Sequence, residues 1–336
     1  MREEKHAGMK VASNEIVSRR AFLRISALGG TLMAAGGCRT ALFTGAATDY
    51  DPNLTVFLSD IHVRGGESFQ LEHFKRVVAE ILKMSPLPKR AVVFGDLAYL
   101  FGRKEDYVTS APYLKQLTDA GISVTIGMGN HDRRSAFLEV HPEYARRTKV
   151  PGRIVSVVDV GSADILMLDS LAGSDDRGSS SSGPVPGTLD AVQQEWLLAE
   201  LPKWKRPVFV CAHHPVFELA AGGQPLSELL FRSPAVAGYI NGHNHRWYAE
   251  WSFRNYSQRK LLCYLGLPST GHWGDIGYTM FRTTPRDAVA SLVQHDFFFP
   301  APLKKGEVRP EKWDALLEKN RGAQYRFVLP PRKEFL

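Results

Sequence analysis

The sequence predicts an α/β protein whose core is a pair of mixed β-sheets. The first reason is the order of its patterns. Apolar, β-prone runs alternate with helical patterns up to about residue 212, and strand-like runs predominate after that point. The second reason is that five of the apolar runs end directly at Asp, Asn or His residues. Because ligands gather at the carboxyl ends of strands in open α/β sheets, these run ends indicate one shared site.

Each of the five strand-like runs delivers residue types that bind metal ions. The runs are 54–59, followed by Asp60 and His62; 91–94, followed by Asp96; 122–128, followed by Asn130, His131 and Asp132; 207–212, followed by His213 and His214; and 237–240, followed by His243 and His245. A mixture of imidazole and oxygen ligands suits Zn, Fe or Mn without a sharp choice among them. The run ends therefore predict a metal site with several protein ligands.

Residue spacing also predicts how these side chains point. Asp60 and His62 are two positions apart, which puts both on the same side of an extended segment. The same spacing puts the two histidines of the His-x-His pair ending at His245 on one face. His213 and His214 are adjacent and face opposite ways in a strand, so we expect only one of them to point at the metals.

Helical patterns fill most of the intervals between the strands. The segment 67–84 has apolar residues at helical spacing and ends before Pro86. The other predicted helices are 106–119, 133–147, a helix capped by Thr188 or Asp190 that runs to Leu201, and 226–232. The further predicted strands are 154–160, 164–168, 247–253, 261–265, 278–282 and 289–297, and a Ser/Gly/Pro-rich loop covers 174–187. We predict one domain over 53–300 and a charged, Pro-rich tail, 301–336, packed on it.

The N-terminus is predicted to be a targeting segment. An Arg-Arg pair at 19–20 precedes an apolar run over 25–37, which at 13 residues is too short to span a bilayer. The pattern resembles a twin-arginine export signal over 1–37, which implies an exported, periplasmic or cell-envelope protein. A basic, disordered N-terminus is the alternative. The run ends before Cys38, which resembles the lipidated residue of a lipoprotein, with ordinary cleavage at a nearby alanine as the competing reading. Residues 38–52 would be a tether, and the lipid would be the only membrane contact.

Composition argues against one class of partner. The chain has 336 residues and a net charge of +7, and six basic and three acidic side chains in residues 1–37 supply +3 of that charge. An apolar content of 44% with 23% charged residues is ordinary for a soluble globular protein. The sequence has no basic stripe interleaved with aromatic residues, so we expect no nucleic-acid partner.

The five blocks resemble, in content and order, the motifs of the calcineurin-like metallophosphoesterases. These motifs are Asp-x-His, Gly-Asp, Gly-Asn-His-Asp, a His that ends a later strand, and Gly-His-x-His. The resemblance covers about residues 53–300. It implies a four-layer α-β-β-α sandwich with two mixed sheets, and two divalent metal ions at the carboxyl ends of the strands. The implied ligands are Asp60, His62 and His245 for one ion, Asn130, His213 and His243 for the other, and Asp96 between them.

The resemblance also implies roles for residues around the metals. His131 would protonate the leaving oxygen or steady the transition state, and Asp132 would orient its imidazole. The candidates for contact with substrate are Arg64, Arg103, Arg133, Arg134, His214, His272 and Trp273, although any single arginine is more often a solvated surface residue. Tyr99 stands where relatives often carry Asp or Asn. Because His62 fills the ligand position, we expect Tyr99 to pack near the site without binding metal.

The implied activity is metal-dependent hydrolysis of a phosphomonoester or a phosphodiester, with water or hydroxide between the metals as the nucleophile. The substrate would be a phosphorylated small molecule or a phosphodiester. The alternative is a non-catalytic binding or scaffold protein that retains the fold and uses metals for stability. That alternative predicts no turnover of any phosphoester and a large change of melting temperature with a chelator. The sequence leaves the native metals, the substrate and the oligomeric state open.

Overall fold

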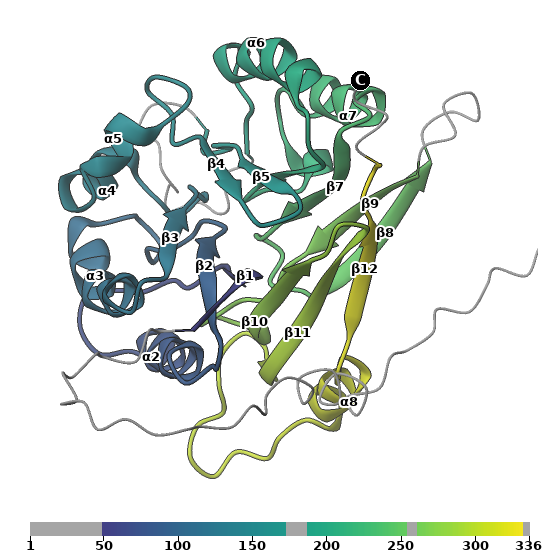
Figure 1. Ribbon diagram of the computed structural model, residues 1–336. Helices are drawn as coiled ribbons and strands as arrows, with labels where there is room; N and C mark the ends of the chain where they lie inside the picture. The colour runs from purple at the N-terminus through teal and green to yellow at the C-terminus, as the bar shows by residue number, and fades with distance from the viewer. Residues whose placement is uncertain (1–48, 173–186, 254–260, 332–336) are drawn as a thin grey trace, which may run out of the picture. The chain divides into compact units, whose positions relative to one another are not determined.

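Two six-stranded β-sheets lie face to face in the computed structural model of the chain, and helices cover their outer faces (Figure 1). The structure describes residues 49–172, 187–253 and 261–331. The predicted signal segment, Cys38 and nearly all of the predicted 174–187 loop lie outside these residues. Residues 46–336 form one compact unit. Within it, the predicted α-β-β-α sandwich with two mixed sheets is confirmed.

The first sheet has the strand order β12-β11-β10-β1-β2-β3. Its parallel strands are β1 (Tyr50–Leu58), β2 (Leu87–Val93) and β3 (Ser123–Ile126), and its antiparallel strands are β10 (Gly274–Thr283), β11 (Asp287–Phe298) and β12 (Gln324–Val328). β1 begins at Tyr50 and not at the predicted residue 54, and Tyr50 pairs with Leu87 at the start of β2. The register Val56–Ala91–Val124 aligns the three parallel strands, so their carboxyl ends meet at one edge.

The second sheet has the strand order β4-β5-β6-β7-β9-β8. Its central strands are parallel: β5 (Asp164–Met167), β6 (Val208–Ala212), β7 (Val236–Asn241) and β9 (Leu261–Gly266). The two edge strands, β4 (Ser156–Asp159) and β8 (Tyr248–Phe253), are antiparallel to their neighbours. The predicted site residues therefore follow β1, β2 and β3 in one sheet and β6 and β7 in the other.

Helices on the outer faces bury the apolar stripes that their sequences predict. They are α2 (Phe69–Ile81), α3 (Lys104–Asp119), α4 (Arg134–Val140) and α5 (Glu143–Arg147) on the first sheet, and α6 (Ala191–Glu200) and α7 (Gly223–Arg232) on the second. The predicted 133–147 helix is interrupted before Pro142, because the residue before a proline avoids the helical region. His141 accordingly has φ −124° and ψ 61°. No helix among the described residues is long and apolar enough to cross a membrane.

Aromatic side chains fill the space between the two sheets. The rings of Phe57 in β1 and Phe281 in β10 stack with their centroids 4.7 Å apart, and Phe281 meets Phe209 of β6 edge-on at 5.1 Å. Side chains alternate along a strand, so Val56 and Leu58 belong instead to the core under the helices. This packing fixes β1 against β6 and holds the two sets of strand ends beside each other.

The segment after residue 300 is more ordered than the predicted tail. It contains α8 (Glu311–Lys319) and β12, which pairs antiparallel with β11 at the edge of the first sheet. Phe327 of β12 is buried in the core between the sheets, and its ring lies 5.1 Å from that of Phe209. In β12, Phe327 is the buried residue and its neighbours are exposed or half-buried. The strand therefore has no apolar run that sequence periodicity would detect.

Candidate metal centre

The seven candidate ligands lie together where the two sheets meet. Asp60 and His62 follow β1, Asp96 follows β2, Asn130 follows β3, His213 follows β6, and His243 and His245 follow β7. Six of them are buried, and His243 is half-buried. Contacts between the sheets hold the strand ends in place. For example, His213 Nδ1 lies 2.9 Å from the Phe94 carbonyl oxygen at the end of β2.

One group of ligand atoms surrounds the end of β1. His245 Nε2 lies 3.1 Å from Asp60 Oδ1 and 3.3 Å from His62 Nε2. The other Asp60 oxygen, Oδ2, accepts hydrogen bonds from Ser59 Oγ and from the backbone N–H of His243, at 2.5 and 3.1 Å. Local groups thus hold one carboxylate oxygen while the second faces the histidines.

A second group lies between the ends of β3, β6 and β7. Asn130 Oδ1 is 3.0 Å from His213 Nε2 and 2.9 Å from His243 Nδ1. The two imidazole nitrogens are themselves 3.3 Å apart. Three elements from both sheets therefore place an amide oxygen and two ring nitrogens around one point.

Asp96 connects the two groups through a single oxygen. Asp96 Oδ2 lies 3.6 Å from His62 Nε2 in the first group and 3.2 Å from His213 Nε2 in the second. Asp96 Oδ1 accepts a hydrogen bond from the backbone N–H of His131 at 2.8 Å. A carboxylate in this position can contribute to two cation sites at once.

The protonation pattern of the histidines fits cation binding. His213 Nδ1 faces the Phe94 carbonyl, and His245 Nδ1 faces the Trp273 carbonyl at 3.1 Å. A carbonyl oxygen only accepts, so each Nδ1 carries a hydrogen and each Nε2 points inward. Each Nε2 lies close to a carboxylate oxygen, so a positive charge between the two atoms is favourable.

The pKa of His213 also shows that positive charge is favourable at this position. Burial lowers the pKa of its imidazole, but the carboxylates of Asp96 and Asp60 outweigh that effect and raise the pKa to about 9. Without a metal, a proton supplies the positive charge that these carboxylates require. The donor set of imidazole nitrogens, carboxylates and one amide oxygen is one that Zn, Fe or Mn can accept.

Five of the candidate ligands have left-handed backbone conformations. Their φ angles lie between 51° and 70°, in a region that costs non-glycine residues on the order of 1–3 kcal/mol each. They are Asp60, His62, Asp96, His243 and His245. The extended geometry assumed from residue spacing is therefore wrong for both pairs. His243 faces Asn130 and His245 faces Asp60, so the two histidines serve different groups.

Gly129 allows the ends of β2 and β3 to approach each other. A Cβ atom built on Gly129 would lie 2.2 Å from Asp96 Oδ1 and 2.5 Å from the Asp96 backbone nitrogen. Any side chain at this position would push Asp96 away from the point between the two groups. Close packing against Asp96 thus explains why a glycine occupies the first position of the Gly-Asn-His-Asp block.

The prediction that Asp132 orients the His131 ring is wrong. The Asp132 carboxylate accepts hydrogen bonds from the backbone N–H groups of Ala98 and Gly129 and from the Tyr107 hydroxyl, at 2.9–3.1 Å. His131 Nδ1 instead lies 3.3 Å from the Leu100 carbonyl, and its Nε2 lies 4.0 Å from Asp96 Oδ2. Burial and the nearby Asp96 charge raise the pKa of Asp132 to about 7. Asp132 therefore holds the loops that carry the site.

His213 and His214 were predicted to face opposite ways in a strand. That geometry does not apply, because β6 ends at Ala212 and both histidines lie beyond it. His214 Nδ1 lies 2.9 Å from Ser170 Oγ, and its ring centroid is 4.7 Å from that of His243. A nitrogen of His214 lies close enough to those of His213 and His243 for the three to form a possible metal-binding group. His214 is thus directed toward the second group.

Residues from the late Gly-His-Trp turn border the first group. The His272 ring centroid lies 4.4 Å from that of His62, and the Trp273 ring centroid lies 4.1 Å from that of His245. Tyr99 meets the His62 ring edge-on with centroids 6.4 Å apart, in agreement with the expectation that it packs near the site. The rings of Tyr99, His272 and Trp273 thus pack against the two histidines of the first group.

The four candidate arginines occupy different environments. Arg64 and Arg103 are exposed, and Arg133 is half-buried next to His131. Arg134 is buried, and it forms a two-point ion pair with Asp169 at 2.7 and 2.8 Å and a hydrogen bond to the Leu171 carbonyl. Arg134 therefore anchors α4 to the chain after β5, and its guanidinium is committed to that role.

Glu218 and the carbonyl groups that hold the histidines were not predicted from the sequence. Glu218 Oε2 lies 3.3 Å from His243 Nε2, on the side of the ring away from Asn130. Glu218 ends a short 3₁₀ turn, Val216–Glu218, and no motif marks it in the sequence. Its proximity to His243 arises only from the fold.

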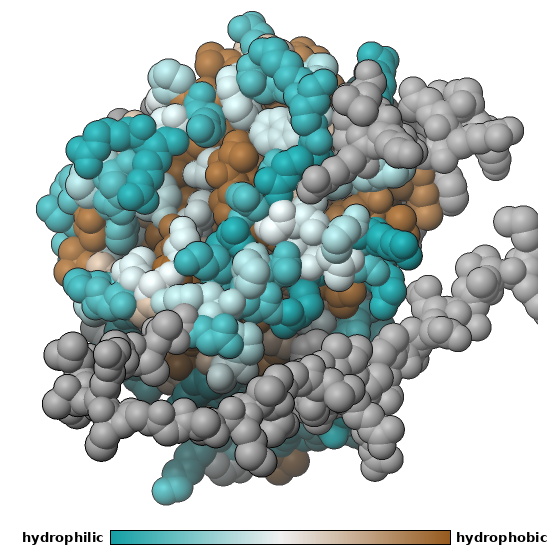
Figure 2. Space-filling view, viewed as in Figure 1, coloured by the Kyte–Doolittle hydropathy of each residue, from teal (hydrophilic) through white to brown (hydrophobic). Residues whose placement is uncertain are grey.

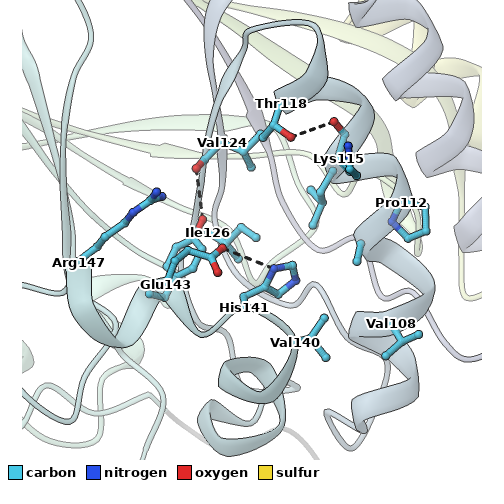
Figure 3. A pocket seen from close by; sticks show the side chains of 13 residues that line it. Val108, Pro112, Lys115, Thr118, Val124, Ile126, Val140, His141, Glu143 and Arg147 are labelled. Atoms are coloured by element: carbon cyan, nitrogen blue, oxygen red, sulfur yellow. Dashed lines mark hydrogen bonds and ion pairs between the residues drawn. The ribbon is translucent and has the colours of Figure 1, made fainter.

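One groove among the described residues lies apart from this cluster. It has a volume of about 630 Å³ and lies between α3, β3, α4 and α5, lined largely by apolar side chains such as Val108, Val124 and Val140 (Figure 3). On the face shown in Figure 2, hydrophilic side chains separate the hydrophobic ones into small patches. None of the candidate ligands lines this groove.

The family described as calcineurin-like phosphoesterase matches residues 54–247. A probable cyclic nucleotide phosphodiesterase of Rhodopseudomonas palustris is 31% identical over 171 residues, which are 48% of this chain and 57% of that protein. The fold is similar to that of a dimetal phosphatase from Danio rerio, with a TM-score of 0.54 and 14% identity over 72% of this chain and 96% of that one. The match to the curated relative thus spans little more than half of its length.

Proposed function

Because the chain belongs to the calcineurin-like phosphoesterase family, we propose that it hydrolyses phosphoester bonds with the help of two divalent metal ions. The observation that carries this proposal is the position of Asp96 Oδ2, which lies within 3.2–3.6 Å of a ring nitrogen in each ligand group. Two divalent metal ions held by these groups would supply a nucleophilic water and stabilise the attacking and leaving oxygens of phosphoryl transfer. Mn, Fe and Zn all suit the donor set.

The ligands divide between the two ions according to the two groups. Asp60, His62 and His245 would hold one ion, Asn130, His213 and His243 would hold the other, and Asp96 would contribute to both. Ser59 and the carbonyls of Phe94 and Trp273 orient these side chains before a metal arrives. A preorganised shell of this kind lowers the cost of binding.

His131 is the proposed proton donor to the leaving oxygen. Its Nδ1 faces the Leu100 carbonyl, which leaves Nε2 directed toward the Asp96 side of the cluster. The side chain is 22% exposed, so a substrate can reach it. Positioned imidazoles contribute roughly 10²- to 10⁴-fold to such proton transfers.

Of the two ester classes, a phosphodiester is the preferred proposed substrate and a phosphomonoester is the second. The similar protein from Rhodopseudomonas palustris is described as a probable cyclic nucleotide phosphodiesterase, which supports this order. A diester carries one negative charge, and the side chains proposed to receive it are Arg64, Arg133, His214 and His272. His272 lies beside His62, Arg133 follows His131 by two residues, and both are half-buried.

A direct assay tests this activity. The full chain, stripped with a chelator and reloaded with Mn²⁺, Zn²⁺ or Fe²⁺, is given bis-para-nitrophenyl phosphate, para-nitrophenyl phosphate and a cyclic nucleotide. We expect turnover that requires added metal and is faster for the diesters. Two bound metals with no turnover of any ester would instead support a binding or scaffold role.

The proposed location is the cell envelope, reached by export and attached through a lipid on Cys38. This proposal rests on the sequence of residues 1–48. The full chain and Cys38→Ser are expressed in a bacterium, and the cells are fractionated. The full chain is expected in the membrane fraction and Cys38→Ser in the soluble exported fraction. An unchanged distribution would contradict lipid attachment.

A further inference from the structure

We propose that Glu218 is a positioning residue, which fixes the tautomer and orientation in which His243 binds metal. The inference rests on the proposed function, because it assigns His243 to the second metal ion. It adds a side chain that neither the motifs nor the spacing of the sequence indicates. Glu218 lies 25 residues before His243 in the chain, at the end of a 3₁₀ turn that follows β6.

Both carboxylate oxygens of Glu218 contact consecutive residues of the His-x-His segment. Oε2 lies 3.3 Å from His243 Nε2, and Oε1 accepts a hydrogen bond from Asn244 Nδ2 at 3.1 Å. The carboxylate therefore spans the turn that leaves β7. Its two contacts restrain the position of the ring and of the following residue together.

The direction of the His243 ring gives this contact its chemical meaning. Nδ1 points inward, 2.9 Å from Asn130 Oδ1 and 3.3 Å from His213 Nε2, while Nε2 points outward to Glu218. An ionised carboxylate only accepts, so it favours the tautomer with the hydrogen on Nε2. The lone pair of Nδ1 then faces the proposed metal position.

His243 differs in this respect from two other candidate ligands. The outward nitrogens of His213 and His245 face the backbone carbonyls of Phe94 and Trp273, which no side-chain substitution removes. For His243 the acceptor is a side chain, and it is charged. The orientation of this ligand can therefore be weakened by a single substitution outside the ligand set.

Exposure sets the expected size of the effect. The Glu218 side chain is 34% exposed and the His243 side chain is 15% exposed, so water can partly replace a lost carboxylate. Loss of a carboxylate that supports a ligating histidine costs about 10- to 100-fold in metal affinity. We expect a value near the lower end, and only for the ion held by His243.

Metal binding tests the inference without reference to turnover. The full chain, Glu218→Ala and Glu218→Gln are titrated with Zn²⁺ and Co²⁺ against a competing chelator, and bound metal is counted by mass spectrometry. We expect Glu218→Ala to bind one ion with unchanged affinity and the other about tenfold more weakly. The Co²⁺ absorption bands of that weaker ion should shift. Glu218→Gln retains an acceptor oxygen and is expected to fall between the two proteins.

Glu228→Ala is the matched control. Glu228 lies on α7, where its contacts include Gln224 and Arg232. Unchanged affinities and unchanged Co²⁺ bands in Glu218→Ala would overturn the role of Glu218 while leaving the proposed function intact. Failure of the unmodified chain to bind two metals would overturn the proposed function, and this inference with it.

Discussion

Asp96→Asn is expected to lower metal-dependent phosphoester hydrolysis by about three orders of magnitude or more. The two proposed ions share Asp96, and the substitution retains its shape while it removes the negative charge that offsets their repulsion. Metal sites of this kind contribute several kcal/mol to transition-state stabilisation, and each 1.36 kcal/mol changes the rate tenfold. The contacts of Asn130 Oδ1 with His213 and His243 do not involve Asp96 and would remain. The loss of activity should therefore arise at the position of Asp96.

The measurement compares kcat and bound metal for the full chain, Asp96→Asn and Asp119→Asn. Asp119 undergoes the same change of charge, but it is an exposed residue of α3 that pairs with Lys115. We expect Asp119→Asn to retain full activity and two metals. Activity of Asp96→Asn within tenfold of the unmodified protein would contradict a shared carboxylate at this position.

Arg134→Met is expected to destabilise the protein by about 3–5 kcal/mol, the cost of removing one partner from a buried ion pair. The Arg134 side chain is 6% exposed and that of Asp169 is fully buried. The remaining Asp169 carboxylate would keep hydrogen bonds from the backbone N–H groups of Ile154 and Leu171, at 2.8 and 3.1 Å. These do not neutralise its charge, so an uncompensated anion would be left in the interior.

Urea denaturation of the metal-free protein measures this effect. Arg153→Met is the control, because Arg153 pairs with Asp190 near the surface, where both side chains are 25–29% exposed. Exposed or partly exposed pairs contribute about 0–1 kcal/mol. The double variant Arg134→Met/Asp169→Leu is expected to recover part of the loss, because it leaves no buried charge. A loss below 1 kcal/mol in Arg134→Met would show that the pair does not anchor α4.

Much of the fold could be predicted because its elements are locally encoded. The apolar runs of β1, β2, β3, β6 and β7 are each followed within four residues by Asp, Asn or His, and parallel strands end at a common edge. The strand-end position of every candidate ligand was therefore available from sequence. β12 was not, since Phe327 is its one buried residue and the core that covers it comes from strands far away in the chain.

The details of the candidate site depended on conformations that local rules exclude. Spacing arguments assumed extended backbone at Asp60 and at His243, but both have positive φ. Such a conformation is unfavourable by itself and persists only where surrounding structure requires it. Asp132 is a separate case. Its carboxylate accepts hydrogen bonds from the backbone N–H of Ala98 and from the Tyr107 hydroxyl, and it does not face the neighbouring His131.

The sequence by itself determined which side chains stand at the strand ends and in what order, because each follows its own strand within a few residues. Only the tertiary structure decided what those side chains face. Glu218 meets His243, Leu100 meets His131, and the Trp273 carbonyl meets His245 across 25 to 31 residues of chain. The physical reason is that these partners are brought together by the packing of two sheets on one core, which no local propensity encodes.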